Sequence, residues 1–262
     1  MATNATISFL GTGSGIPTAD RFFSSSLMHL GGLHFLIDAG EPCIHLLRER
    51  GIPIQEIDAI FITHGHVDHI GGVPALIQGA KLLGRLKPLP VFLPEEMIGP
   101  LRAWIAALYL NEEELGFTIV WTAWRNEVPE MFAKGISITP YKNGHLDRYR
   151  SSLPTDVRAF CSYSLEIKKE SFRVIFSGDL AAAEELTPLV AKKTSVLITE
   201  LSHFFSEELV IALSEATIDT LCLVHLSEEY AYDRSELKIK LEQLLPRIND
   251  IILPEDGAVL DF

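Results

Sequence analysis

Four side chains that bind metal ions well lie within one short segment of the sequence. Residues 64–69 read HGHVDH and so contain three histidines and one aspartate. Imidazole nitrogen and carboxylate oxygen are ligands that zinc, manganese and iron accept in proteins. The alternating His64 and His66 can point the same way and bind one metal ion, whereas Asp68 and His69 follow a turn of the chain and can reach a second. The spacing predicts a metal site built around this segment.

Three further candidate ligands follow other apolar strand-like runs. His145 comes after ISITPYK, Asp179 after FRVIFS, and His225 ends the run TLCLV. Each of them, taken singly, could be an ordinary polar residue at the end of a strand. A metal ion needs three or more protein ligands in addition to water, so residues 64–69 cannot complete two sites alone. Together the three residues supply the missing ligands, which favours a site for two divalent metal ions.

Strands must hold these ligands in place. The hydrophobic pattern predicts strands that end at or shortly before the ligands, at 59–63, 136–141, 172–177 and 221–225. Between them and beyond them it predicts helices at 42–50, 72–83, 95–109, 182–191, 206–215 and 234–245. Leu237, Leu241 and Leu244 recur at the spacing of one buried helix stripe. We expect an α/β fold with two layers of sheet and helices on the outer faces.

Composition and charge narrow the class of protein. The chain has 262 residues, 47% apolar and 22% charged, as expected for one globular domain spanning residues 1–262. Its net charge of −13 repels phosphate backbones at long range, which argues against general coating of nucleic acid. Cys43, Cys161 and Cys222 show no CxxC spacing and are expected to be small buried hydrophobes. We find no secretory signal and no apolar run of roughly 18 residues, so we expect a cytoplasmic protein with no membrane span.

The ligand pattern resembles the metallo-β-lactamase superfamily over nearly the whole chain. The resemblance rests on the HGHVDH segment, FLIDAG, FSGD and VHLSEEY. It implies a four-layer αββα sandwich with the metal ions at one edge. It implies that one metal ion is held by His64, His66 and His145. It implies that the second is held by Asp68, His69 and His225, with Asp179 bridging the two. Asp38 would lie behind the ligands and orient their loop through hydrogen bonds, although it could instead cap the following turn.

Within this superfamily the chain is most similar to the ribonuclease Z branch. The similar segments include FLGTGSGIPTADRFFSSSL, VLITELSHF and the terminal EDGAVLDF. Two features differ from that branch. The stretch between His145 and Asp179 is too short for the long arm that grips transfer RNA, and no HST-type histidine motif lies between Glu200 and His225. A smaller phosphodiester or nucleotide substrate therefore fits better.

The resemblance also implies a mechanism. A hydroxide that bridges the metal ions would be the nucleophile, and Asp68 would either accept its proton or act only as a ligand. Glu200 and His203 are candidates for donating a proton to the leaving group, or surface residues at a helix start. Arg148 and Arg150 follow His145 and could grip a phosphate, or be solvated loop residues. Zinc is the expected metal, with manganese and iron as alternatives.

Several functions remain open to a chain of this kind. The leading hypothesis is a dinuclear phosphodiesterase, and the alternatives are tRNA 3′ endonuclease activity of the ribonuclease Z type and hydrolysis of a thioester, lactone or lactam. A di-iron protein that reduces oxygen or nitric oxide is disfavoured, because His66 stands where that group commonly has a glutamate. A binding module without catalysis is disfavoured by the full ligand set. The apolar residues of 101–110 predict core, or a contact in a possible homodimer.

Overall fold

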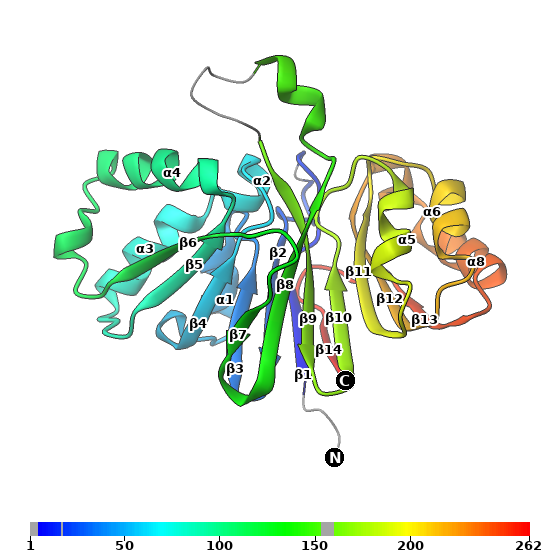
Figure 1. Cartoon of the computed structure of the whole chain (residues 1–262), viewed down its shortest axis with the longest axis horizontal. Helices are drawn as coiled ribbons and strands as arrows, with labels where there is room; N and C mark the ends of the chain where they lie inside the picture. Colours follow the sequence, from blue (N-terminus) through cyan, green and yellow to red (C-terminus); the bar gives the residue numbers. More distant parts are fainter. Residues whose placement is uncertain (1–4, 17, 153–159) are drawn as a thin grey trace. The chain divides into compact units, whose positions relative to one another are not determined.

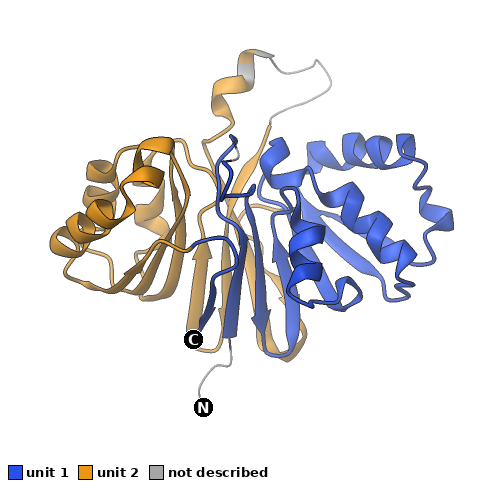
Figure 2. Ribbon diagram, turned by 180° about the vertical axis from the view of Figure 1, so that it is seen from behind, with its two compact units in different colours: residues 1–124, 255–262 blue, residues 125–254 orange. Residues whose placement is uncertain are grey.

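The structure, a computed structural model, describes residues 5–16, 18–152 and 160–262. It divides into two compact units (Figure 2). Unit 1 comprises Met1–Trp124 and Glu255–Phe262, and unit 2 comprises Arg125–Pro254. Each unit contains one seven-stranded sheet. The prediction of a single domain over residues 1–262 stays a prediction.

The sheet of unit 1 has the strand order β14-β1-β2-β3-β4-β5-β6. Its strands are β1 Ala5–Gly11, β2 Ser25–Leu30, β3 Leu33–Ile37, β4 Ile57–Phe61, β5 Leu89–Leu93, β6 Ile119–Ala123 and β14 Val259–Asp261. Strands β3 to β6 are parallel, whereas β14, β1, β2 and β3 pair antiparallel. Parallel strands end together at one edge, so the loop after β4 leaves the sheet beside the loop after β3.

Helices of unit 1 pack on its sheet (Figure 1). They are α1 Cys43–Glu49, α2 Val67–Ile70, α3 Val73–Leu82 and α4 Glu95–Ala107, with 3₁₀ turns η1 Ile54–Glu56 and η2 Glu112–Glu114. Buried side chains of α1, α3 and α4 form one core with the sheet. On β3, β4 and β5 the aromatic rings of Phe35, Phe61 and Phe92 contact in series, and Trp124 packs on the last two. This packing fixes β4, the strand that leads into the HGHVDH segment.

The sheet of unit 2 has the strand order β13-β12-β11-β10-β9-β8-β7. Its strands are β7 Glu130–Phe132, β8 Ile136–Asn143, β9 Ser162–Lys169, β10 Phe172–Phe176, β11 Thr194–Leu201, β12 Ile218–Leu226 and β13 Ile248–Ile252. Strands β10 to β13 are parallel, and β7 to β10 pair antiparallel. The loop after β10 and the ends of β11 and β12 therefore lie at one edge of this sheet.

Helices of unit 2 form a second core with its parallel strands (Figure 1). They are α5 Leu186–Leu189, α6 Ser206–Leu213, α7 Glu228–Tyr232 and α8 Arg234–Leu244. The 3₁₀ turns are η3 Ala133–Gly135, η4 Asp147–Ser152 and η5 Ala183–Glu185. On α8, Leu237 and Leu241 are buried as predicted, but Leu244 is exposed and Leu245 is buried in its place. The stripe continues at a spacing of four, so the third predicted position is wrong.

The predicted α/β fold class is confirmed, because two seven-stranded sheets flanked by helices account for most of the chain. Within the described ranges, no helix is long and apolar enough to cross a bilayer.

Candidate metal centre

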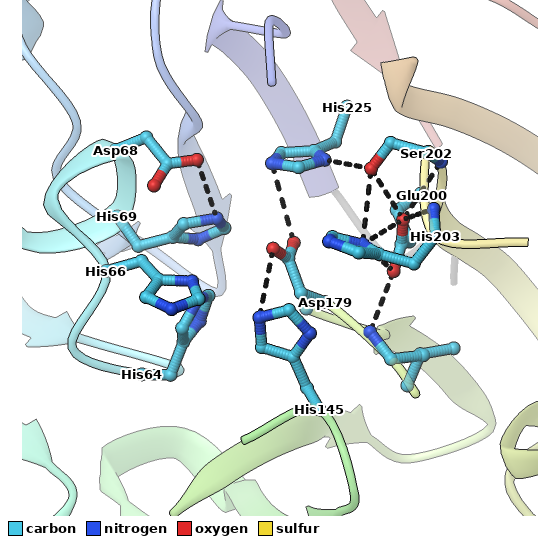
Figure 3. A network of polar contacts seen from close by, with 12 residues as sticks. His64, His66, Asp68, His69, His145, Asp179, Glu200, Ser202, His203 and His225 are labelled. Atoms are coloured by element: carbon cyan, nitrogen blue, oxygen red, sulfur yellow. Dashed lines mark hydrogen bonds and ion pairs between the residues drawn. The ribbon is translucent and has the colours of Figure 1, made fainter. Parts of the chain in front are cut away.

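The ligand segment of unit 1 begins three residues after β4 and runs into the short helix α2. His64, Asp68 and His69 are buried, and His66 is half-buried. His64 Nε2 lies 3.0 Å from His66 Nδ1, and His69 Nε2 lies 3.5 Å from Asp68 Oδ2 (Figure 3). The structure therefore brings these residues together as two neighbouring pairs of donors, as the spacing predicts.

Asp38 and Thr63 hold the rings of this segment from behind. Asp38 Oδ2 lies 2.7 Å from His69 Nδ1, and its Oδ1 accepts a hydrogen bond of 2.8 Å from the Thr63 amide. The Thr63 hydroxyl lies 2.9 Å from Asp38 Oδ2 and 3.0 Å from His64 Nδ1. With Nδ1 engaged on both rings, Nε2 of His64 and of His69 is the nitrogen that can face a metal ion. Thr63 was not predicted from the sequence, since threonine after a strand is common.

Gly40 gives this segment the space to pack against the loop after β3. A Cβ at this position would lie 2.3 Å from the Asp68 carbonyl oxygen and 2.5 Å from Phe23 Cβ. Neither contact is compatible with a side chain. The backbone of Asp68 is therefore set by close contact with a glycine as well as by hydrogen bonds.

Two predicted ligands of unit 2, His145 and His225, lie beside the carboxylate of the third, Asp179 (Figure 3). His145 Nε2 lies 3.6 Å from Asp179 Oδ2, and His225 Nε2 lies 3.6 Å from Asp179 Oδ1. All three side chains are buried. Each carboxylate oxygen thus faces a different imidazole.

His225 owes its direction to an irregularity in β12. Pairing between β11 and β12 shifts register after Glu200, and His225 has a positive φ of 48°. An extra residue in one strand re-aims the side chain at that point. The structure therefore places His225 within a bulge near the end of β12, one residue before the strand stops at Leu226.

A buried glutamate organises the turn after β11. The Glu200 carboxylate accepts hydrogen bonds from the amides of Leu180, Ser202 and His203 and from the Ser202 hydroxyl. His203 Nδ1 lies 2.8 Å from both Glu200 oxygens. Every contact places a donor against Glu200, so this side chain orients its neighbours as an acceptor. The chain bends at residues 202–204, and this bend brings the His203 ring back onto the Glu200 carboxylate.

Ser202 links this glutamate to a predicted metal ligand. Its hydroxyl lies 2.9 Å from Glu200 Oε2 and 2.9 Å from His225 Nδ1 (Figure 3). A hydroxyl can accept from the imidazole N–H and donate to the carboxylate, which leaves His225 Nε2 toward Asp179. Ser202 was missed at the sequence level, because nothing in ELSH marks a serine that contacts a histidine 23 residues later.

The donor set fits divalent metal ions. In unit 2, donor atoms of Asp179, His203 and His225 lie within 4.8 Å of one another. In unit 1, His64 and His66 offer two close nitrogens, and Asp68 and His69 offer an oxygen and a nitrogen. In metal sites, the imidazole nitrogen that does not bind the metal is typically held by a hydrogen bond, as Nδ1 of His69 and of His225 is here. The clusters suit metal binding, without selecting one metal or a number of ions.

Two of the three cysteines, Cys43 and Cys222, are buried thiols that are poorly suited to bind metal. Burial raises the pKa of the Cys222 thiol to about 12, and the charge of Asp250 adds to the shift. Burial likewise raises the pKa of the Cys43 thiol, with Glu41 as the second cause. A metal ion binds the thiolate form, so neither group is prepared for it.

The predicted phosphate-binding arginines are placed only in part. Arg148 is exposed, and its guanidinium carbon lies 4.9 Å from the centroid of the Tyr149 ring. The side chain of Arg150 lies outside the described residues. Phosphate contact by either arginine stays a prediction.

Comparison with protein families matches residues 5–239 to the family described as "Anti-Pycsar protein Apyc1". The chain belongs to the Apyc1 family. Among curated relatives of this Apyc1-family chain, Ribonuclease Z of Pseudomonas putida is 43% identical over 88 residues. That match covers 33% of this chain and only 28% of the relative. Ribonuclease Z of Halalkalibacterium halodurans is 26% identical over 284 residues, covering 89% of this chain and 92% of that one.

Solved structures confirm the fold of this Apyc1-family chain. The metallo-β-lactamase fold protein YhfI from Bacillus subtilis has a TM-score of 0.78 at 21% identity and covers 99% of this chain and 100% of its own. The short form of human tRNase Z has a TM-score of 0.75 at 17% identity, covering 97% and 98% of the two chains. The predicted metallo-β-lactamase fold and the resemblance to the ribonuclease Z branch are both confirmed. The chain therefore combines this fold with donor clusters that suit metal ions.

Proposed function

We propose that this chain is a dinuclear metal-dependent phosphodiesterase that acts on a small phosphodiester or nucleotide. The observation that carries the proposal is the pair of donor clusters, one in each unit, whose rings are held from behind by Asp38 and by Ser202. Neither cluster alone supplies ligands for two metal ions. The proposal is that the two clusters act together.

In this proposal the ligands divide as the superfamily resemblance implies. One metal ion is bound by His64, His66 and His145, the other by Asp68, His69 and His225, and Asp179 contributes to both. Zinc is the proposed metal, with manganese and iron as alternatives. When bound, two divalent cations lower the pKa of a coordinated water to about 7 and neutralise charge on an in-line phosphoryl displacement.

The remaining roles belong to side chains around the ligands. We propose that His203 donates a proton to the leaving group, because it is exposed and its Nδ1 is anchored on Glu200. Glu200 then acts through His203, which it orients. Asp68 binds metal and is the proposed acceptor for the proton of the attacking water. Arg148 and Arg150 are proposed to bind substrate phosphate, since a guanidinium can contact two phosphate oxygens at once.

The tRNA 3′ endonuclease remains the second candidate, and the ribonuclease Z relatives favour it. Two sequence features favour the smaller substrate. The stretch from His145 to Asp179 is short, and a net charge of −13 disfavours binding to an extended phosphate backbone. Hydrolysis of a thioester or lactone is the third candidate, because the same donor set supports it.

One set of assays separates these candidates. The purified protein is analysed for bound metal and then assayed with bis-p-nitrophenyl phosphate, 2′,3′- and 3′,5′-cyclic nucleotides, precursor tRNA, and a lactone and a thioester. The Asp179→Ala variant controls for contaminating activity. Cleavage of the phosphodiesters, with kcat/KM higher than for tRNA or either ester, supports the proposal. A higher kcat/KM for precursor tRNA supports the second candidate, and turnover of esters alone supports the third.

Two further proposals concern where the protein is located and whether it forms a dimer. Cys43 and Cys222 are free thiols, which fits the proposed cytoplasmic location, since thiols persist there in reduced form. We also propose that the protein forms a homodimer, for the reason given below for α4.

A further inference from the structure

Glu185 connects the two loops of unit 2 that carry His145 and Asp179. Its Oε1 accepts a hydrogen bond of 2.6 Å from the amide of Gly144, the residue before His145. Its Oε2 accepts a hydrogen bond of 2.8 Å from the amide of Ala181, two residues after Asp179. One carboxylate therefore spans both loops, and each of its oxygens is used by a different loop.

The surrounding contacts show why this link matters. In the first loop, the His145 amide donates to Asn143 Oδ1, so the Glu185 bond adds a second restraint beside it. In the second loop, the Leu180 amide donates to Glu200 and the next amide donates to Glu185. Glu185 therefore ties the backbone of the second loop to that of the first.

By restraining both loops, Glu185 restrains the distance between the proposed ligands His145 and Asp179. His145 Nε2 and Asp179 Oδ2 are 3.6 Å apart. Two ligand atoms of one metal ion must keep a separation set by the metal–ligand bond lengths, which are about 2.0–2.2 Å for zinc. A restraint on the backbones of both loops keeps that separation before a metal ion binds. The loops then lose less conformational entropy on binding, which favours metal affinity.

We propose that Glu185 is a positioning residue that fixes the His145 and Asp179 loops relative to each other and thereby raises metal affinity. Glu185 touches no reacting atom. It acts through the backbone on both sides of the pair. This inference rests on the proposed metal site but not on the identity of the substrate.

The test compares three substitutions on a short segment. Glu185→Gln keeps one acceptor oxygen and turns an amide N–H toward the other donor, so it breaks one of the two bonds. Glu185→Ala removes both. Glu184→Gln is the matched control, because Glu184 is the neighbouring carboxylate and is exposed. Zinc and manganese affinities are measured by competition with a chelator, and the melting temperature of each metal-free protein is measured alongside.

We expect zinc affinity to fall about tenfold for Glu185→Gln and more for Glu185→Ala, the range typical when a residue behind a metal ligand is removed. Glu184→Gln keeps wild-type affinity. A purely structural role would lower the melting temperature of the metal-free protein without changing the affinity of the folded fraction. A crystal structure of Glu185→Gln should show the His145–Asp179 separation widened or spread.

The outcomes separate this inference from the proposed function. Wild-type affinity in Glu185→Gln, or an equal loss in Glu184→Gln, overturns the positioning role and leaves the metal site standing. If the wild-type protein binds neither zinc nor manganese, the proposed metal site is overturned and the positioning role with it. Because Glu185→Gln makes the smaller change, it decides the question if Glu185→Ala fails to fold.

Discussion

The imidazole of His203 is held through Nδ1 by Glu200, and this contact allows a sharp test of proton donation. A general acid accelerates departure of a strongly basic leaving group by about 10²–10⁴-fold. We expect His203→Ala to reduce kcat by roughly that factor on a cyclic nucleotide, whose leaving group is an alkoxide. The same variant should change turnover of bis-p-nitrophenyl phosphate little, because nitrophenolate leaves without a proton. Steady-state kinetics on both substrates measure the difference.

The exposed His45 of α1 supplies the control for this substitution. His45→Ala should leave both rates unchanged. Equal losses on the two substrates in His203→Ala would mean that His203 is a ligand or a structural residue, since proton donation must discriminate between leaving groups.

Asp38 contacts His69 Nδ1 and the Thr63 amide and hydroxyl, so its carboxylate orients two ligand rings at once. In Asp38→Asn an amide N–H can face His69 Nδ1–H, and this clash disorders the ring. We expect about a 10–100-fold loss of zinc affinity, measured by chelator competition. Asp58→Asn is the matched control, because Asp58 also accepts from a backbone amide, that of His34. Unchanged affinity in Asp38→Asn would leave Asp38 with only a turn-capping role.

The residues that could be predicted are those whose type is chemically unusual at a strand end. Histidine and aspartate after an apolar run stand out, so the sequence predicts all seven candidate ligands, and their binding of metal stays a prediction. Thr63, Ser202 and Glu185 could not be found in this way, because serine, threonine and glutamate occur at many such positions. Their importance comes from contacts with partners distant in the chain, such as Gly144 and Glu185, which are 41 positions apart.

Among the elements, the loop after β3 depends on Gly40 for its close contact with the ligand segment. Gly40→Ala would place Cβ 2.3 Å from the Asp68 carbonyl oxygen, so one of the two segments must move. We expect a loss of stability of about 1–3 kcal/mol, as for other overpacked sites, together with weaker metal binding. Thermal melts and chelator competition measure both effects.

Gly99 in α4 is the control for this substitution, because a Cβ there meets no atom within 4 Å. Gly99→Ala should leave metal binding unchanged. Any change in stability would reflect the following Pro100, whose ring disfavours the helical conformation in a preceding residue that has a Cβ. Normal metal binding by Gly40→Ala would show that the loop after β3 adjusts without moving Asp68.

The C-terminal end of α4 and the residues just after it carry both buried and exposed apolar side chains. Leu101 and Ile105 are buried, as predicted for core, whereas Trp104, Leu108 and Tyr109 are exposed at 41%, 47% and 87%. The prediction that the last three belong to the core is therefore wrong. The spacing of residues 101, 104, 105 and 108 predicts a single helical face. Helix α4 ends at Ala107, however, so Leu108 and Tyr109 lie beyond it, and Tyr109 has a positive φ of 61°. The sequence alone does not say where the helix ends or which of these side chains are covered.

The exposed apolar side chains at the C-terminal end of α4 and just beyond it, Trp104, Leu108 and Tyr109, are the basis of the proposed homodimer. We expect Leu108→Glu to convert a dimer into a monomer, because it places a charge where apolar side chains would meet. Sedimentation velocity at micromolar concentration measures the change. Ile211→Glu is the control, since Ile211 is 71% exposed on a different helix. A monomeric wild-type protein would overturn the proposed dimer.

The hydrophobic pattern predicts most helices and strands, but their ends only to within a few residues. The helix predicted at 95–109 is observed at Glu95–Ala107, and the strand predicted at 59–63 is observed at Ile57–Phe61. The helix predicted at 182–191 is observed as the 3₁₀ turn η5, Ala183–Glu185, followed by the short helix α5, Leu186–Leu189. Helix α2 was missed because its residues were assigned to the ligand loop.

At the scale of the whole molecule, thermal unfolding tests two proposals together: that the chain is a single domain and that both units contribute to one metal site. We expect calorimetry to show one cooperative unfolding transition whose temperature rises when zinc is added. At a free zinc concentration 100 times the dissociation constant, binding to the folded state alone adds about 2.7 kcal/mol. Removing the metal with a chelator should reverse the shift. Two transitions, only one of them sensitive to zinc, would contradict both proposals.

The last strand has a consequence for how the protein is made. Strand β14 belongs to unit 1, where it pairs with β1, and Asp256 just before it accepts hydrogen bonds from the amides of Thr12 and Phe22. A ribosome synthesises all of residues 125–254 before these residues emerge. The nascent unit 1 therefore waits with one strand edge open, and an open edge can pair with a neighbouring chain. Translation speed through the second half of the message thus sets how long this edge is exposed to aggregation.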